Sequence, residues 1–444
     1  MLIIDQDIGL SKKYKKNYCI TLLLCLFMMF ISAVVDTSGR VLFFAYLFSV
    51  ITVYAFTRSY LNVIYMSVAM LINFSLCDGH FFGLSNQRIL LLITIIFLIT
   101  IFVRITRKKM IVPGWFYIIW AMYIIFNEMY IQGRGLSSLF SLLMFFILSY
   151  ILELQAEKNR KNAEKILLTV VIGVLFIVIV AYIELALGHT FFYSRWTINE
   201  RYRNGILRVG STVADPNNVC FFILPFLFLL ETNAMKLLIK PILRKFIELF
   251  ILLLIFLTSS RTGLVALLVG VSVYFLLKRK VYFVICVPII GVASNVILRM
   301  LESLIGQYQE STSYRNYIIE MALLSWSEHP VFGLGGGAIS SVLNSGSGAT
   351  INTMNTFVFM LMCYGIIGLA FYILFFILLI KSDVQRWIHE KKLNNDSLLR
   401  FSCVVSLLIL AYTLDTFYMV WMWLFPAIFT GLRYFEDEEI IDNL

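Results

Sequence analysis

Arginine recurs beside other polar residues at the ends of long apolar runs, and these residues could do chemistry. Arg203 and Arg208 precede Asp215-Pro216 at the start of one run. Arg261 follows Ser260 in a connection of almost no length between two other runs. A planar guanidinium binds phosphate oxygens in a bidentate manner, whereas lysine acts as a point charge. Because a charge so close to apolar runs is costly without an anionic partner, we predict a phosphate-containing ligand. The alternative is that these arginines snorkel towards lipid headgroups.

A second set of residues could transfer protons. Asp215 precedes a proline, so we expect it to be non-helical and to cap the next helix, with its carboxylate at the membrane surface. Glu328 and His329 end a predicted helix that also carries Arg315. Either could act as a general base if that helix end faces a cavity, where burial would bring its pKa towards neutrality. The alternative is a solvated helix terminus.

Asn355 stands at the start of a later apolar run that contains Gly365 and Gly368. Glycines at this spacing let helices pack closely, which is the role we expect of both. A separate glycine cluster, Gly333 with Gly335–Gly337, has no strand before it and no phosphate-binding lysine after it, so a nucleotide site is not indicated. The seven cysteines are scattered and form no CxxC pair. We therefore expect no metal site, no disulfide framework and no cofactor.

Composition identifies the class of protein. Of the 444 residues, 60% are hydrophobic and 14% are charged, and the mean hydropathy is +0.88. Soluble domains carry about a quarter of their residues as charged side chains. We therefore predict an all-α polytopic integral membrane protein, because runs of about 20 apolar residues cross a bilayer as helices.

The apolar runs predict about 12–14 transmembrane helices, because several runs are shorter than the roughly 20 residues that a span needs. The runs lie near 18–36, 40–57, 59–77, 89–103, 111–128, 135–153, 166–187, 218–232, 246–259, 262–277, 281–298, 354–380, 400–416 and 418–434.

The connections between these runs orient the chain. Counted on alternate sides, they carry 26 basic residues on one side and ten on the other, and all 17 lysines are on the richer side. Short basic loops stay in the cytoplasm, so both termini are expected there and only arginines face outward. The net charge of +10 reflects this topology, and we expect no nucleic-acid partner.

We expect residues 1–444 to form a single transmembrane domain. It has two long outer loops, 188–217 and 299–353, and a solvated cytoplasmic tail, 433–444. Within the larger loop, Ser313 is predicted to cap a helix that runs from Tyr314 towards His329 and is ended by Pro330. Its apolar face would contain Tyr317, Ile318, Met321, Leu324 and Trp326. Such a helix is typical of an amphipathic lid on the outer membrane surface.

The polar groups, taken in order, resemble the O-antigen ligase and polymerase superfamily over roughly residues 195–370. The pieces that carry the resemblance are Arg208…Asp215-Pro216-Asn217, Ser260-Arg261, Arg315…His329-Pro330-Val331-Phe332-Gly333-Leu334-Gly335, and Asn355 ahead of Gly365-Ile366-Ile367-Gly368. Members are bacterial membrane glycosyltransferases that act at the outer, periplasmic face of the inner membrane on undecaprenyl-pyrophosphate-linked glycans. Residues 1–190 are similar only in being hydrophobic.

One position distinguishes the branches of that superfamily. Ligases carry a histidine directly before the Asn355 position, and here the residue is Met354. A thioether cannot accept or deliver a proton, so the resemblance favours an O-antigen polymerase of the Wzy type. A ligase that transfers glycan to the lipid A core is the alternative. A lipid-linked oligosaccharide flippase is a further alternative, but it is expected to show two related halves.

The resemblance implies a metal-independent transfer of O-antigen or capsule-type repeat units between lipid carriers. Arg208 and Arg261, with Arg203, would bind the donor pyrophosphate, and Arg315 the acceptor pyrophosphate or a closing lid. Asp215, Glu328 and His329 are the candidate catalytic bases, and Asn355 is a further site residue. The implied partners are undecaprenyl-pyrophosphate-linked glycans, membrane lipids and a chain-length regulator.

Overall fold

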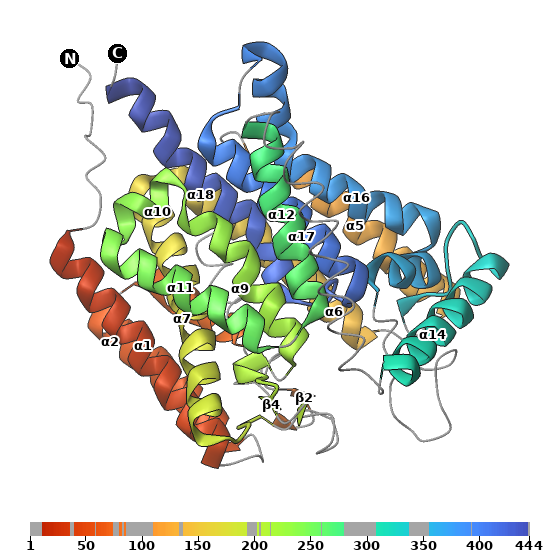
Figure 1. Cartoon of the computed structure of the whole chain (residues 1–444), viewed down its shortest axis with the longest axis horizontal. Helices are drawn as coiled ribbons and strands as arrows, with labels where there is room; N and C mark the ends of the chain where they lie inside the picture. Colours follow the sequence, from red (N-terminus) through yellow and green to blue (C-terminus); the bar gives the residue numbers. More distant parts are fainter. Residues whose placement is uncertain are drawn as a thin grey trace. The chain divides into compact units, whose positions relative to one another are not determined.

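The structure is a computed structural model of the whole chain (Figure 1). It describes residues 11–35, 40–57, 59–73, 80–81, 84–85, 110–132, 136–192, 202–203, 206–213, 215–258, 260–278, 308–336, 355–391 and 393–442. The predicted runs 89–103 and 281–298 lie outside these residues, as do Arg201 and Met354.

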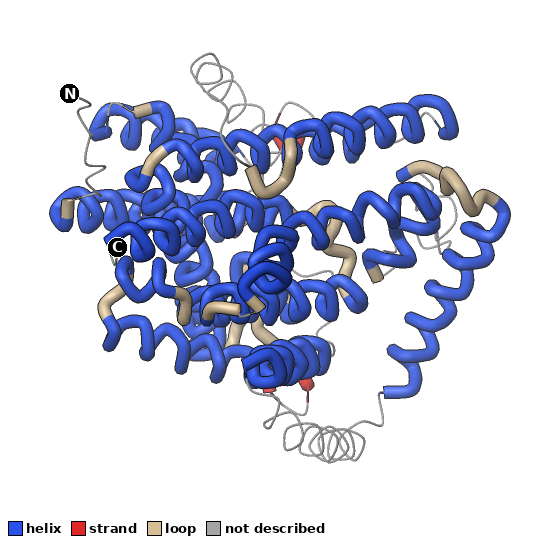
Figure 2. Tube along the Cα trace, turned by 90° about the horizontal axis from the view of Figure 1, so that it is seen from above, coloured by secondary structure: helices blue, strands red, loops and turns tan. Residues whose placement is uncertain are grey.

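The described residues form an all-α protein, as predicted (Figure 2). The helices are α1 (Lys12–Val35), α2 (Arg40–Thr57), α3 (Tyr60–Ile72), α5 (Gly114–Phe126), α6 (Leu136–Lys158), α7 (Arg160–Leu187), α9 (Pro216–Leu230), α10 (Asn233–Leu238), α11 (Pro241–Leu257), α12 (Arg261–Lys278), α14 (Tyr308–Glu328), α16 (Thr356–Glu390), α17 (Asn395–Thr413) and α18 (Val420–Asp442). Short elements complete them: a π-helical turn η2 (Asn127–Gln132), a 3-10 turn η3 (Ser211–Val213), and the antiparallel pairs β1 (His80–Phe81) with β2 (Leu84–Ser85) and β3 (Tyr202–Arg203) with β4 (Ile206–Leu207).

Twelve of the fourteen predicted apolar runs coincide with a described helix. Among the described residues, six helices contain segments long and apolar enough to cross a membrane, in α1, α6, α7, α12, α16 and α17, and three shorter apolar helices accompany them. The chain is therefore a multi-pass membrane protein.

The chain divides into two compact units. The first comprises Met1–Ile111, Met144–Ser259 and Val420–Leu444. The second comprises Val112–Leu143 and Ser260–Met419.

Helix α7 is central to the first unit, where it packs against α1, α3, α9, α11 and α18. Its residues 166–181 are apolar on every face, which is the pattern of a helix surrounded by protein. Leu167 and Phe176 are accordingly buried. At its start the Asn159 side chain accepts a hydrogen bond of 2.8 Å from the backbone nitrogen of Asn162, so the helix is capped.

Helix α18 also belongs to the interior of the first unit. Trp421, Trp423 and Phe425 are all fully buried. The helix continues into the predicted tail 433–444, where Phe435 and Glu436 are buried. These two residues are therefore packed and not solvated as the sequence had suggested.

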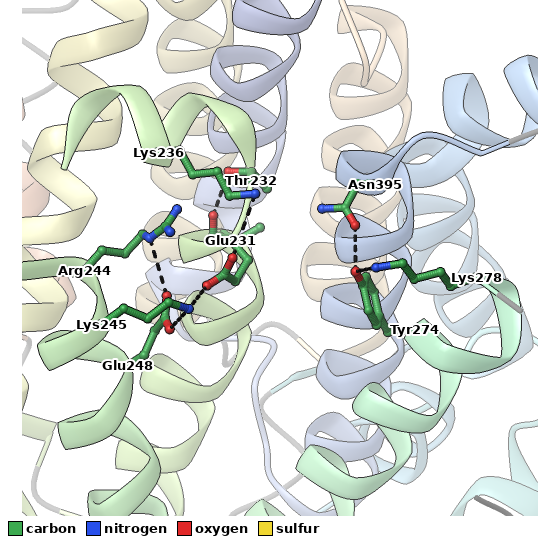
Figure 3. Close-up of polar contacts among 10 residues, drawn as sticks. Glu231, Thr232, Lys236, Arg244, Lys245, Glu248, Tyr274, Lys278 and Asn395 are labelled. Atoms are coloured by element: carbon green, nitrogen blue, oxygen red, sulfur yellow. Dashed lines mark hydrogen bonds and ion pairs between the residues drawn. The ribbon is translucent and has the colours of Figure 1, made fainter. Parts of the chain in front are cut away.

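An ion-pair cluster joins the end of α9 to the first turns of α11 in the first unit (Figure 3). Lys245 contacts Glu231 and lies 2.7 Å from Glu248. Lys236 lies 3.9 Å from Glu231, and Arg244 lies 3.6 Å from Glu248. The Lys245 side chain is 61% exposed, so solvent screens these attractions.

Replacing Lys245 by alanine is expected to change stability little, by about 1 kcal/mol or less, because exposed ion pairs contribute that amount. Thermal unfolding of the detergent-solubilised protein at low and high salt measures the effect. The difference between variant and wild type should shrink as salt rises. A large loss of stability that is independent of salt would contradict this account of the cluster.

Helices α12 and α17 pack along each other in the second unit. The Ser406 hydroxyl donates to the carbonyl oxygen of Ala266 at 3.1 Å. The Tyr274 hydroxyl donates to the Asn395 side chain at 2.6 Å and accepts from Lys278 at 2.8 Å (Figure 3). These polar contacts fix the position of α12 along α17.

A buried ion pair joins α17 to α16 in the same unit. The Arg400 guanidinium contacts Asp383 through Nη2 at 2.6 Å and through Nε at 3.1 Å. The Ser397 hydroxyl donates to the same carboxylate at 2.7 Å. The Arg400 side chain is 0% exposed, so its charge is compensated entirely inside the protein.

Candidate functional site

Arg208 follows strand β4 directly and lies on a segment that the end of α7 holds in place. The buried Glu184 carboxylate accepts backbone hydrogen bonds from Gly210 at 3.1 Å, Ser211 at 2.8 Å and Phe191 at 3.0 Å. Ser211 has a positive φ of 49°, which few residues other than glycine adopt. The Arg208 side chain is half-buried, with its Nε atom inside the protein. The backbone segment that carries Arg208 is therefore held in place by contacts within the protein itself.

Asp215 caps α9, as predicted from the proline that follows it. Its carboxylate accepts hydrogen bonds from the backbone nitrogens of Asn217 at 2.7 Å and Asn218 at 3.4 Å. Pro216 occupies the first turn, where a missing N–H costs nothing. The same oxygen atom makes both cap bonds, so the structure gives this carboxylate a defined structural role.

Arg261 opens α12 in the second unit. The Ser260 hydroxyl accepts a hydrogen bond of 3.2 Å from the backbone nitrogen of Gly263, so Ser260 caps the helix. The Arg261 side chain is half-buried and its Nε atom is inside the protein. A helix N-terminus favours negative charge, and the guanidinium adds a full positive charge beside it. This helix start is suited to bind an anion.

The helix predicted in the segment 299–353 is present, but its start and part of its buried face differ from the prediction. Helix α14 begins at Tyr308, so Ser313 lies within the helix and does not cap it. Helix α14 packs against α16, and its Ile318 and Ala322 are buried, whereas Tyr317 and Leu324 are 59% and 58% exposed. The predicted burial of Ile318 is confirmed, whereas Ala322 is buried in place of the predicted Tyr317 and Leu324.

Glu328 and His329 are both exposed at the end of α14. The prediction that either residue acts as a general base required a buried side chain, and neither side chain is buried. Arg315, on the same helix, is half-buried. Arg203 lies in strand β3, and its side chain is outside the described set.

The glycine-rich turn after α14 packs directly on a break in α16. Gly365 has φ 62° and ψ −166°, which interrupts the helix. The carbonyl groups of Met362 and Cys363 then accept backbone hydrogen bonds from Leu334 at 2.8 Å and Gly335 at 2.7 Å. Gly365 does permit close packing, but against this turn and not against another helix as predicted.

Replacing Gly333 or Gly365 by alanine should separate the turn from α16. A Cβ atom at Gly333 would lie 2.5 Å from the carbonyl carbon of Cys363, and one at Gly365 would lie 2.2 Å from the carbonyl oxygen of Val331. Both glycines have positive φ, so alanine also adds strain of about 1–2 kcal/mol. Thermal unfolding should show a loss clearly larger than that strain.

Gly188 provides the matched control for these two substitutions. Its φ of 63° is similar, but a Cβ atom there would have nothing within 4 Å. The variant Gly188→Ala should therefore lose only the strain contribution. Equal losses in all three variants would show that the turn does not depend on close backbone approach.

A buried network of carboxylate and hydroxyl groups lies beneath the glycine-rich turn. The Glu128 carboxylate accepts hydrogen bonds from the backbone nitrogen of Gly336 at 2.7 Å and the Tyr364 hydroxyl at 3.0 Å. The Tyr364 hydroxyl also bonds that of Tyr418 at 2.9 Å. Asn127, beside Glu128 in turn η2, donates to the Phe332 carbonyl. The turn is thus fixed by polar contacts from η2, and Tyr364 of α16 binds the same Glu128 carboxylate.

Asn355 caps α16, and its side chain accepts hydrogen bonds from the backbone nitrogens of Phe357 at 2.9 Å and Val358 at 3.2 Å. Arg208 and Asp215 belong to the first unit. The predicted site residues of the second unit are Arg261, Arg315, Glu328, His329 and Asn355. Packing of α14 on α16 brings the helix of Arg315 to the helix that Asn355 caps.

Glu128 and Glu184 were missed in the reading of the sequence. Both are acidic residues within or at the end of apolar runs, and each is at most 1% exposed. An ionisable residue in such a run is by default a candidate for function, and that signal was available. Which backbone groups they bind depends on the fold.

Comparison with known proteins gives one family. Residues 246–373 match a family model described as O-Antigen ligase. The matched segment contains Arg261, Arg315 and Asn355, whereas Arg208 precedes it. No curated protein matches the chain.

Proposed function

Because the chain belongs to the O-antigen ligase/polymerase superfamily, we propose that it is a membrane glycosyltransferase that polymerises lipid-linked repeat units. The donor would be a glycan on undecaprenyl pyrophosphate, and the product would be an O-antigen or capsule-type polysaccharide. The reaction would take place at the periplasmic face of the inner membrane, with both termini in the cytoplasm. The orientation is supported by the distribution of basic residues between alternate connections.

The observation that supports this function best is Arg261 at the capped start of α12, inside the segment that matches the family. A half-buried guanidinium and a helix N-terminus together stabilise negative charge. Arg208 adds a second guanidinium, on a segment fixed by Glu184. We assign both to the donor pyrophosphate, and Arg315 to the acceptor pyrophosphate or to lid closure.

The chemistry requires the pyrophosphate to leave as an anion. A hydroxyl of the acceptor sugar attacks the anomeric carbon of the donor, and the bond from that carbon to the pyrophosphate oxygen breaks. Fixed guanidinium groups in an environment of low dielectric constant stabilise the charge that develops on this oxygen. The arginines thus supply the stabilisation that a metal ion supplies in other enzymes.

Two activities occur in this superfamily, namely polymerase and ligase. Met354 occupies the position of the ligase histidine and favours the polymerase. The description of the matching family favours the ligase. A gel of surface polysaccharide from a deletion strain separates them. One repeat unit on each lipid A core indicates a polymerase, whereas cores without any repeat unit indicate a ligase or a flippase.

A reconstituted assay tests glycosyl transfer itself. Purified protein would be incubated with lipid-linked repeat units isolated from the deletion strain. Products longer than one repeat unit, still attached to the lipid carrier, support the polymerase. Failure to lengthen the glycan, together with normal chain lengths in the deletion strain, would refute the proposed function.

A further inference from the structure

The segment between α17 and α18 is tied to the start of α16, which Asn355 caps. The carbonyl oxygen of Leu414 accepts hydrogen bonds from the backbone nitrogen of Thr356 at 3.1 Å and from its hydroxyl at 2.6 Å. The backbone nitrogen of Thr416 donates to the same hydroxyl at 2.8 Å. Asp415 lies between these two anchored residues, so its position is fixed. Helix α17 ends at Thr413, so the predicted run 400–416 extends too far and Asp415 is outside the helix.

The Asp415 carboxylate has an oxygen atom that no described residue satisfies. The backbone nitrogen of Phe417 donates a hydrogen bond to the carboxylate. The Oδ1 atom, in contrast, is buried and accepts no hydrogen bond from the described part of the chain. A buried acceptor without a donor is unfavourable and requires an explanation. A donor that arrives from outside the chain, such as a sugar hydroxyl, would provide one.

Several ionisable side chains of the described residues interact electrostatically with Asp415. Cys363 and Tyr372 of α16 and Tyr418 of the same segment lie within its electrostatic range. Glu128 also acts on Cys363 and Tyr418. Burial raises the pKa of Asp415 to about 7. A carboxylate of this kind is partly ionised at neutral pH and suited to accept a proton.

The other base candidates lack this combination of features. The Asp215 carboxylate caps α9, and Glu328 and His329 are exposed. We propose that Asp415 is the catalytic base that accepts the proton of the acceptor hydroxyl during glycosyl transfer. This proposal rests on the proposed function and deepens it.

The step balances without any co-reactant. The acceptor oxygen forms a bond to the anomeric carbon as that carbon loses its bond to the pyrophosphate oxygen, which keeps the electron pair. The hydroxyl proton passes to Oδ1 of Asp415, which later releases it to solvent. The Phe417 backbone hydrogen bond holds the carboxylate in place meanwhile.

The test compares the pH dependence of glycan transfer in the wild type and two variants, with isolated lipid-linked repeat units as substrate. In the wild type kcat/KM should rise with pH through about 7, as the carboxylate ionises. The variant Asp415→Asn should lose about 10²–10⁴-fold in rate together with this rise. The variant Asp415→Glu retains a carboxylate in a different position, so it should retain the rise with a displaced midpoint.

A matched control removes a buried carboxylate from the other end of α17. Asp396 is 1% exposed in the first turn, and Asp396→Asn should keep the wild-type pH dependence. Two results would overturn the role of Asp415 while leaving the proposed function intact. One is a folded Asp415→Glu whose rate rises with pH at the same midpoint as the wild type, and the other is an unchanged rate in Asp415→Asn. An inactive wild type would refute the proposed function, and the base assignment with it.

Discussion

Replacing Arg208 or Arg261 by alanine is expected to lower the rate of glycan transfer about 10²–10³-fold, which corresponds to about 2.7–4 kcal/mol of activation free energy. Each substitution removes a fixed donor from the charge that develops on the leaving pyrophosphate. The protein should remain folded in the membrane, because both side chains are only half-buried. Chain-length ladders in cells and initial rates with lipid-linked repeat units measure the effect.

Substitution by lysine at the same positions separates the effect of the positive charge from that of the side-chain geometry. Lysine retains the positive charge but loses the planar fork that binds two phosphate oxygens together. The variants Arg208→Lys and Arg261→Lys should therefore show rates between those of the wild type and the alanine variants. Arg386→Ala provides a control, because Arg386 lies near the end of α16 that is expected in the cytoplasm. Ladders of wild-type length in both alanine variants would contradict the assignment.

The second large effect concerns stability. Replacing Asp383 by alanine is expected to destabilise the protein by about 3–5 kcal/mol, because it leaves a buried charge without its partner. The Arg400 side chain is 0% exposed, and its charge contacts Asp383 at 2.6 Å. Thermal unfolding of the purified variant in detergent measures the loss. Expression in the membrane should fall in parallel.

A double variant tests the cause of that loss. Replacing Asp383 by leucine and Arg400 by methionine removes both charges and keeps apolar volume in the same place. Such replacements of buried pairs are often neutral, so most of the lost stability should return. Lys245→Ala, at an exposed ion pair, should change stability far less than Asp383→Ala does. A double variant as unstable as Asp383→Ala would refute this explanation.

Much of the fold was predictable from the sequence, because the pattern of apolar runs depends on local composition alone. The run 40–57 coincides with α2 at both ends. The cap at Asp215 could also be predicted, since a carboxylate before a proline restricts the backbone locally. The start of α14 could not, because Ser313 has the side chain of a typical cap, yet the helix begins at Tyr308 and includes it.

The candidate site was predictable only in its charged residues. Arginines at run ends are visible in the sequence, whereas the network of Glu128, Tyr364 and Tyr418 joins positions far apart in the chain. The environment of Asp415 could not be predicted from the sequence either. Its position within an apolar run was visible, but the buried oxygen depends on hydrogen bonds that tie its neighbours to Thr356.

The central claim is that Arg208 and Arg261 are each required to bind the diphosphate of a polyprenol carrier. The affinity for undecaprenyl pyrophosphate tests it most directly, measured for the wild type, Arg208→Ala, Arg261→Ala and the control Arg386→Ala. The first two variants should bind more weakly because each loses a guanidinium that can hold phosphate oxygens, whereas Arg386→Ala should bind as the wild type does. Unchanged affinity in Arg208→Ala or Arg261→Ala would contradict the claim.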